Sequence, residues 1–166
     1  MDHFVFYARS FAWLSSGRGT MKRLTGILVA GLLLGAVGIG HATVRIANDR
    51  GGRIGNYVDK YKQLRDSGEF VIIDGFCTGA CTIVLGAISR DRICVTSNAK
   101  FGFQAAWDLD PNGQRVTNSE ATQMLYWVYP PEVRHWIAQQ GGLTPHMIFL
   151  QGKQLQALYR TCSAEA

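Results

Sequence analysis

The stretch Val71-Ile-Ile-Asp-Gly-Phe-Cys-Thr-Gly-Ala-Cys-Thr-Ile-Val84 decides the fold. It opens with an apolar run typical of a strand that is buried on both faces of a parallel sheet. A glycine-containing turn follows, and then an apolar helix begins. Many enzymes mount a nucleophile at such a strand-to-helix corner. The residue at the apex is Gly79, which has no side chain, so the corner has the form of this mount without the reactive group.

The segments around this corner alternate between helix and strand patterns. Thr144-Pro145 is a good helix start, so we expect a last helix running from there toward Leu150. Residues 108–115 are polar and indicate a turn or hairpin. Alternating helices and short strands predict one α/β domain over residues 43–166, with a mostly parallel sheet flanked by helices. The expected strands are 43–47, 70–73, 92–96 and 100–103, and the other expected helices are 54–66, 80–88, 118–129 and 131–140.

The N-terminal part has the pattern of an export signal. Lys22 and Arg23 precede the uncharged run 25–40, and Gly40-His41-Ala42 places small residues before a cleavage point at Thr43. We therefore interpret residues 21–42 as a signal peptide, which predicts an exported, periplasmic protein. The alternatives are an uncleaved inner-membrane anchor formed by residues 25–40, or a buried helix. Residues 1–20 show no usable pattern and are interpreted as an over-extended N-terminus.

The four cysteines all follow this segment. An even number of cysteines in an oxidising compartment indicates disulfides, and four cysteines allow three pairings. The alternative is buried free thiols that act as small apolar side chains. A zinc site is disfavoured because no second close cysteine pair and no nearby histidine accompany the first pair. The candidates are Cys77, Cys81, Cys94 and Cys162, and we predict neither a metal nor a cofactor.

The charge of the chain gives no support for nucleic-acid binding. The formal net charge is +5, but four of the 17 basic residues and only one of the 12 acidic residues precede Thr43. About +2 remains for the rest, without a basic stripe or aromatic residues interleaved with Lys and Arg. Contact with a membrane is expected only through residues 21–42, if they are not cleaved.

Three segments, in this order, resemble the Clp protease proteolytic subunit and its crotonase-like superfamily, and most closely secreted Clp-like proteins of bacteria. They are Ile46-Ala-Asn-Asp-Arg-Gly-Gly52, Gly75-Phe-Cys-Thr-Gly-Ala80 and Ser97-Asn-Ala-Lys-Phe-Gly-Phe-Gln104. The resemblance covers roughly residues 43–162. It lacks the stretch that normally precedes the Gly-Gly segment, which implies a shortened form of the Clp/crotonase-like fold or a truncated chain.

The resemblance implies roles for individual positions. In the family, backbone N–H groups form the oxyanion hole, and the matching residues here are Gly51, Gly52 and Ala80. The nucleophilic serine of the family falls on Gly79 and the catalytic histidine falls on Gln104. The family's third catalytic residue, an acid, falls near Gln151 by spacing. The resemblance also implies a homo-oligomer, since Clp relatives work as rings.

These substitutions predict a catalytically inactive, Clp serine-protease-like domain that acts in binding or assembly, with a peptide or protein as a candidate ligand. The first alternative is an active hydrolase or peptidase whose nucleophile is Cys81 or Cys77, since a thiolate at a helix start is reactive. His135 and His146 are the histidines available as its base. A second alternative is an oxyanion-hole enzyme of the crotonase kind, which needs no serine.

An aromatic group later in the chain has two interpretations. Aromatic side chains are common interface anchors, but they also fill the cores of α/β domains. We favour packing on the sheet over an interface. The residues are Tyr126, Trp127, Tyr129 and Trp136.

Overall fold

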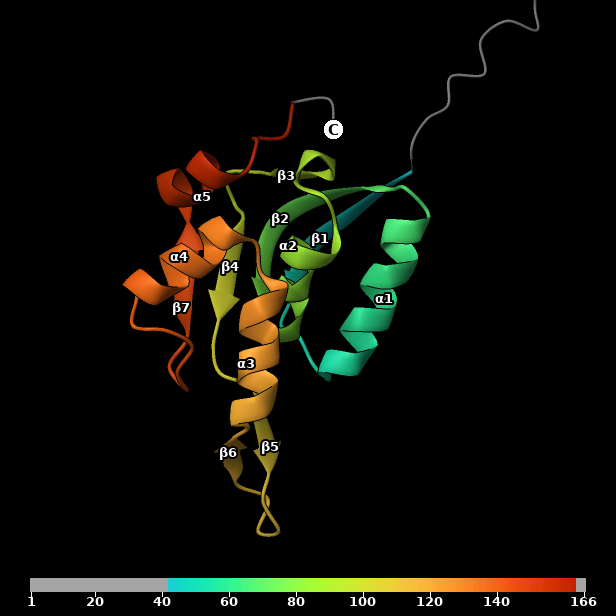
Figure 1. Ribbon diagram of the computed structural model, residues 1–166. Coiled ribbons are helices and arrows are strands. Elements are labelled where there is room, and N and C mark those ends of the chain that lie inside the picture. The colour runs from blue at the N-terminus through green and yellow to red at the C-terminus, as the bar shows by residue number, and fades with distance from the viewer. Residues whose placement is uncertain (1–41, 164–166) are drawn as a thin grey trace, which may run out of the picture. The chain divides into compact units, whose positions relative to one another are not determined.

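The structure is a computed structural model that describes residues 42–163. The predictions made for residues 1–20 and 21–42 therefore lie outside the described residues, apart from Ala42. Within the described part, a five-stranded sheet is packed against helices (Figure 1), which confirms the α/β class. None of the helices formed by residues 42–163 is long and apolar enough to span a membrane.

The central strand of the main sheet is β2. On one side it pairs with β1 along nearly its whole length, and on the other side it pairs first with β3 and then with β4. All three are parallel to β2, whereas β7 lies antiparallel to β4 at the edge. The sheet is therefore mostly parallel, as predicted. The strands are β1 (Thr43–Asp49), β2 (Phe70–Thr78), β3 (Ile93–Val95), β4 (Lys100–Phe103) and β7 (Ile148–Gln151).

The helices follow the sequence pattern closely. The predicted helix 54–66 forms over those residues, and the predicted helix 80–88 begins as the 3-10 helix η1 before continuing as α2. Asn118 caps α3 because its side-chain oxygen accepts a hydrogen bond from the Ala121 N–H at 2.8 Å. The helices are α1 (Ile54–Asp66), η1 (Gly79–Ile83), α2 (Val84–Ala87), η2 (Arg90–Arg92), α3 (Ser119–Val128), α4 (Pro131–Gln139) and α5 (Gly152–Leu158).

The predicted last helix from Thr144 toward Leu150 is wrong. Residues 148–151 form the strand β7, and α5 begins only at Gly152. The hydroxyl of Thr144 does accept the N–H of His146 at 3.2 Å, but the Thr144 carbonyl accepts the N–H of Ala105 at 2.8 Å. The free edge of β4 offers ladder hydrogen bonds to the next apolar run, and Leu150 becomes fully buried there. This tertiary pairing outweighs the local helix signal.

The core lies between the sheet and the helices. Phe103 on β4 contacts Tyr129 edge-on at 5.2 Å between ring centroids and Trp136 at 5.7 Å. Tyr129 and Trp136 are buried, so for these two the packing interpretation of the aromatic group is confirmed. Trp127 differs, because 62% of it is exposed on α3.

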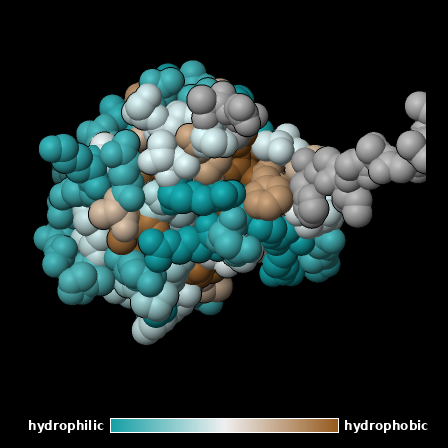
Figure 2. All heavy atoms as spheres, turned by 90° about the horizontal axis from the view of Figure 1, so that it is seen from above, coloured by the Kyte–Doolittle hydropathy of each residue, from teal (hydrophilic) through white to brown (hydrophobic). Residues whose placement is uncertain are grey.

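The polar segment 108–115 lies in a hairpin, as the sequence indicates. Its strands are β5 (Trp107–Leu109) and β6 (Arg115–Thr117), and they pair antiparallel with each other. Figure 1 shows the hairpin extending beyond the end of α3, away from the main sheet. The face in Figure 2 is largely hydrophilic, with hydrophobic residues visible only in small separate areas.

The close crossing of α2 and α3 allows a stability test at Gly86. A Cβ atom there would lie 1.8 Å from the Val128 carbonyl oxygen, which no rotamer change can relieve. We expect Gly86→Ala to lower the free energy of unfolding by about 2–3 kcal/mol, as overpacking does. Urea unfolding with the disulfides intact measures this. The matched control is Gly55→Ala in α1, where no atom lies within 4 Å; it should gain about 0.5–1 kcal/mol. Equal stability of the two variants would contradict the packing described.

Candidate functional site

The corner predicted from the sequence is formed by the end of β2 and the start of η1. β2 ends at Thr78, and Gly79 takes the left-handed conformation with φ of 57°. A glycine adopts this conformation at little cost. A Cβ atom at Gly79 would have the Arg50 carbonyl oxygen as its nearest neighbour, at 3.6 Å. The apex therefore has space for a side chain. Glycine is favoured there by the left-handed backbone conformation and not by a lack of space.

Two disulfides are present, and they select one of the three pairings. Cys77 at the end of β2 is bonded to Cys81 in η1, so this bond spans the corner. Cys94 on β3 is bonded to Cys162, which fastens the C-terminal segment to the sheet. The interpretation as free thiols is wrong, since none of the four cysteines is free. Two disulfides are typical of a protein from an oxidising compartment.

The Gly-Gly turn after β1 packs directly on the corner. A Cβ atom on Gly51 would lie 2.5 Å from the Thr78 carbonyl oxygen and 2.7 Å from the Ala80 nitrogen. Gly51 also has φ of 77°, so only glycine fits this position without strain. The structure thus brings together Gly51, Gly79 and Ala80, three of the positions selected from the sequence.

A carboxylate next to the turn engages one of the expected oxyanion donors. The N–H of Gly51 donates to Asp49 Oδ1 at 2.9 Å. The hydroxyl of Tyr57 donates to the same oxygen, and Lys60 Nζ donates to Oδ2 at 3.3 Å. The Gly51 N–H is therefore directed at an internal acceptor. Gly52 is exposed, and Ala80 is buried as the second residue of η1.

The charges around Asp49 shift two pKa values in opposite directions. Burial by itself raises the pKa of Asp49, but the hydrogen bonds from Tyr57, Gly51 and Lys60 together bring it below its ordinary value. Burial, followed by the bond to the Asp49 carboxylate, raises the pKa of Tyr57 to about 12. At neutral pH the cluster thus contains the Asp49 carboxylate and the neutral Tyr57 phenol.

Gln104 directly follows β4, whose end lies beside the corner. Thr78 pairs with Gly102 in the ladder between β2 and β4, and Gln104 is two residues beyond Gly102. The spacing that placed an acid near Gln151 is not supported, because Gln151 pairs with Lys100 at the other end of β4. Lys100 and Gln104 are four positions apart along the chain, which is roughly 13 Å in an extended strand. Gln151 is therefore not part of the corner.

The two histidines have local partners on the surface. His135 is exposed on α4, and its Nε2 lies 3.0 Å from the side-chain nitrogen of Gln139. His146 is exposed in the loop before β7, where its N–H donates to Thr144. Residues 42–163 contain no group of three His, Cys, Asp or Glu side chains close enough to hold a metal ion.

Sequence reasoning missed the buried polar side chains that support η1. Thr82 is fully buried, and its hydroxyl donates to the Gly79 carbonyl at 2.7 Å and shares a 2.7 Å hydrogen bond with the Tyr129 hydroxyl. Tyr61, from α1, donates to the Cys81 carbonyl at 3.0 Å. The one sequence pattern that pointed to these contacts is the helical spacing of Tyr57 and Tyr61, which places both aromatic side chains on the same side of α1. These bonds and the disulfide hold the corner in one conformation.

The comparisons with known proteins give distant structural similarity. No protein-family model matches the chain, and no curated protein matches it. A solved structure of a point mutant of ClpP1 from Listeria monocytogenes is similar at 12% identity, with a TM-score of 0.42 over 70% of this chain and 68% of that chain. A peptidase from Plasmodium falciparum is similar at 9% identity, with a TM-score of 0.45 over 71% and 75% of the two chains.

The cluster around Asp49 predicts a pH-dependent stability. We expect Asp49→Asn to lower the free energy of unfolding by roughly 1–3 kcal/mol at pH 7, because three hydrogen bonds to a charged group weaken. The folded pKa of Asp49 is lowered, so its contribution is complete above the unfolded value near 3.9 and is lost as the pH falls through the folded value. The difference between the two proteins should therefore shrink below about pH 4 in urea unfolding.

The matched control is Asp59→Asn, which removes the same charge from an exposed position of α1. It should change the stability by less than about 0.5 kcal/mol. A difference between wild type and Asp49→Asn that stays constant from pH 7 to pH 2.5 would contradict the role given to the Asp49 carboxylate.

Proposed function

We propose that residues 43–166 form an exported domain that has a hydrolase-like corner but does not catalyse hydrolysis, and that acts in binding or assembly. One observation carries this proposal: the apex of the corner, Gly79, has no side chain, and the nearest sulfur atoms belong to the disulfide Cys77–Cys81. Acyl transfer needs a nucleophile, a base within hydrogen-bond reach and donors for the oxyanion. No hydroxyl or thiol at the apex is available for the first role.

The base and the oxyanion donors are also incomplete. The amide of Gln104 takes up no proton near neutral pH, so it does not replace a histidine base. The N–H of Gly51 is engaged by Asp49, which leaves Gly52 and Ala80 as the remaining proposed oxyanion donors. Loss of a nucleophile or a base typically costs about 10⁶-fold in turnover. What remains of the site is its backbone, which can still bind a carbonyl or carboxylate oxygen.

The alternative of a cysteine hydrolase requires a free thiolate. Cys77 and Cys81 are both fully buried and bonded to each other, so neither supplies one in the oxidised protein. The disulfides also support export, and we propose the periplasm as the location. Under this proposal, residues 21–42 are the signal peptide, or residues 25–40 the anchor.

The binding or assembly part of the proposal rests on an exposed apolar surface, which we call the hairpin surface. Aromatic residues and methionine are enriched at interfaces. We propose that this surface contacts a second copy of the chain, with a peptide or protein ligand as the alternative partner. The hairpin surface consists of Trp107 and Leu109, which share one face of the β5–β6 hairpin, and of Met124 and Trp127 on α3; all four are between 42% and 62% exposed.

Active-site labelling tests the absence of catalysis. The purified protein, kept without reductant, should remain unlabelled by a fluorophosphonate probe and by iodoacetamide, since neither a reactive serine nor a thiol is accessible. Iodoacetamide should label the same protein after denaturation and reduction, which serves as the positive control. Stoichiometric labelling of the folded, oxidised protein at residues 77–82 would contradict the proposal.

Assembly is tested by light scattering coupled to size-exclusion chromatography. The wild type should elute as an oligomer, and the variants Leu109→Ser and Trp127→Ser should shift toward the monomer because each removes apolar area from the hairpin surface. Val58→Ser is the matched control, since Val58 is 46% exposed but lies on α1. A monomeric wild type, or an oligomer unchanged by both variants, would refute self-assembly through this surface.

A further inference from the structure

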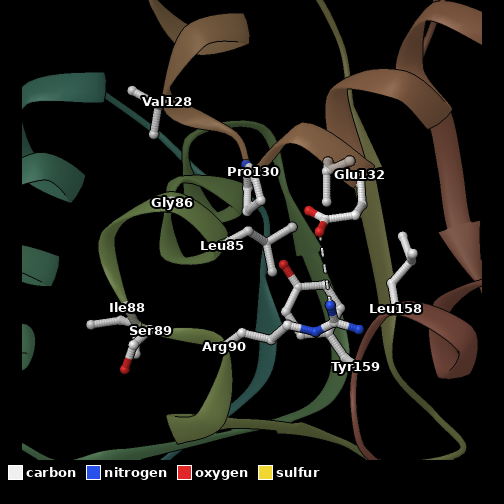
Figure 3. A pocket seen from close by; sticks show the side chains of 11 residues that line it. Leu85, Gly86, Ile88, Ser89, Arg90, Val128, Pro130, Glu132, Leu158 and Tyr159 are labelled. Carbon is white, nitrogen blue, oxygen red and sulfur yellow. Dashed lines mark ion pairs between the residues drawn. The ribbon is translucent and has the colours of Figure 1, made fainter.

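A cavity separate from the corner lies among α2, η2, α5 and the link between α3 and α4. Its volume is about 350 Å³, which is within the range of small-ligand pockets. Figure 3 shows the side chains from these elements that line it, with Leu85, Arg90, Glu132 and Tyr159 closest together. Its apolar walls are formed by Leu85, Ile88, Val128, Pro130, Val133 and Leu158.

The hydroxyl of Tyr159 is directed into this cavity. Only 3% of Tyr159 is exposed, and the residue lines the cavity. In Figure 3 the hydroxyl oxygen points between Leu85 and Glu132. Burial raises the pKa of Tyr159 to about 12, so the group stays a neutral phenol that can donate a hydrogen bond. A phenol hydroxyl in the wall of a cavity is a donor that a polar ligand atom can meet.

Arg90 lies at the same side of the cavity. Its guanidinium carbon is 5.6 Å from the centroid of the Tyr159 ring, and its Nη1 is 4.0 Å from Glu132 Oε1. The latter distance is too long for a hydrogen bond, so the ion pair leaves the donors of Arg90 available. The dashed line in Figure 3 marks this pair across the cavity.

We propose that this cavity binds a small carboxylate with an apolar body. Arg90 and Tyr159 donate hydrogen bonds to the carboxylate, and the aliphatic walls surround the remainder of the ligand. The planar guanidinium matches a carboxylate better than any other common anion except phosphate, and the apolar walls do not suit phosphate. This site is independent of the proposed function of the corner.

Glu132 competes with a ligand carboxylate for Arg90. Its carboxylate faces Arg90, so an incoming carboxylate must replace it there. Glu132 lies on α4 with its side chain half exposed, and it can turn toward solvent. Removing its charge should therefore strengthen binding of an acid, whereas a cavity that binds amines would lose affinity from the same change.

Two sources could supply such a ligand: a free short-chain fatty acid, or the C-terminal carboxylate of a peptide that ends in an apolar residue. Hexanoate represents the first source and N-acetyl-leucine the second. Hexanamide and N-acetyl-leucinamide have the same shapes without the charge. Ligand-observed NMR titration of the full chain should show binding of at least one acid, about tenfold or more tighter than its amide, as expected for a charge-assisted hydrogen bond. The preferred acid identifies the source.

Variants test the two donors. Arg90→Gln should weaken binding of the preferred acid about tenfold or more and leave its amide unchanged. Tyr159→Phe should weaken it by a few-fold, and Glu132→Gln should strengthen it. Arg115→Gln removes the same charge from the β5–β6 hairpin, outside the cavity, and should have no effect. Urea unfolding of each variant checks that the fold is intact.

Four results would overturn the proposal. The first is that neither acid binds at millimolar concentration, and the second is that each acid and its amide bind equally. The third is that Arg90→Gln keeps wild-type affinity for the acid. The fourth is a preference for hexylamine that Glu132→Gln abolishes, which would make the cavity a site for amines.

Discussion

The contact of the Gly51 turn with the corner at Thr78–Ala80 is the constraint on which the rest of the structure depends. Backbone meets backbone there with no room for a side chain on Gly51. The contact fixes how β1 leaves the sheet and where α1 begins. Asp49 then binds the Gly51 N–H, Tyr57 and Lys60, so that the turn, the strand end and the helix form one hydrogen-bonded unit.

The corner is held from both of its sides. The disulfide Cys77–Cys81 ties the strand to η1, and Tyr61 and Thr82 bond the η1 backbone from the helix side. All of these restraints act on the backbone, and none places a reactive group at Gly79. A rigid corner with an empty apex and an internally engaged Gly51 N–H agrees with the proposal of a domain that binds rather than catalyses. The disulfide also leaves neither flanking sulfur atom as a free thiol.

Local patterns predicted most of the fold, and the family resemblance selected Gly51, Gly79 and Ala80, which the structure brings together. The apolar run 70–73 and the periodicity of 54–66 gave a correct strand and helix because local preference and burial agree there. The helix predicted from Thr144-Pro145 does not form, because residues 148–151 pair with the edge of β4 instead. A local sequence pattern contains no information about this edge. The disulfide between Cys94 and Cys162 also depends on a contact between distant segments, 68 residues apart in the sequence. So does the cavity at Tyr159, which no sequence motif marks.

The contact between the Gly51 turn and the corner is measured most directly by NMR on the oxidised protein. The structure predicts a strong nuclear Overhauser effect between the α-protons of Gly51 and the amide proton of Ala80, because these groups are in van der Waals contact. Loss of this signal on reduction of the disulfides would agree with the account. If the oxidised, folded protein shows no such effect, the turn and the corner do not meet, and the site described here does not exist.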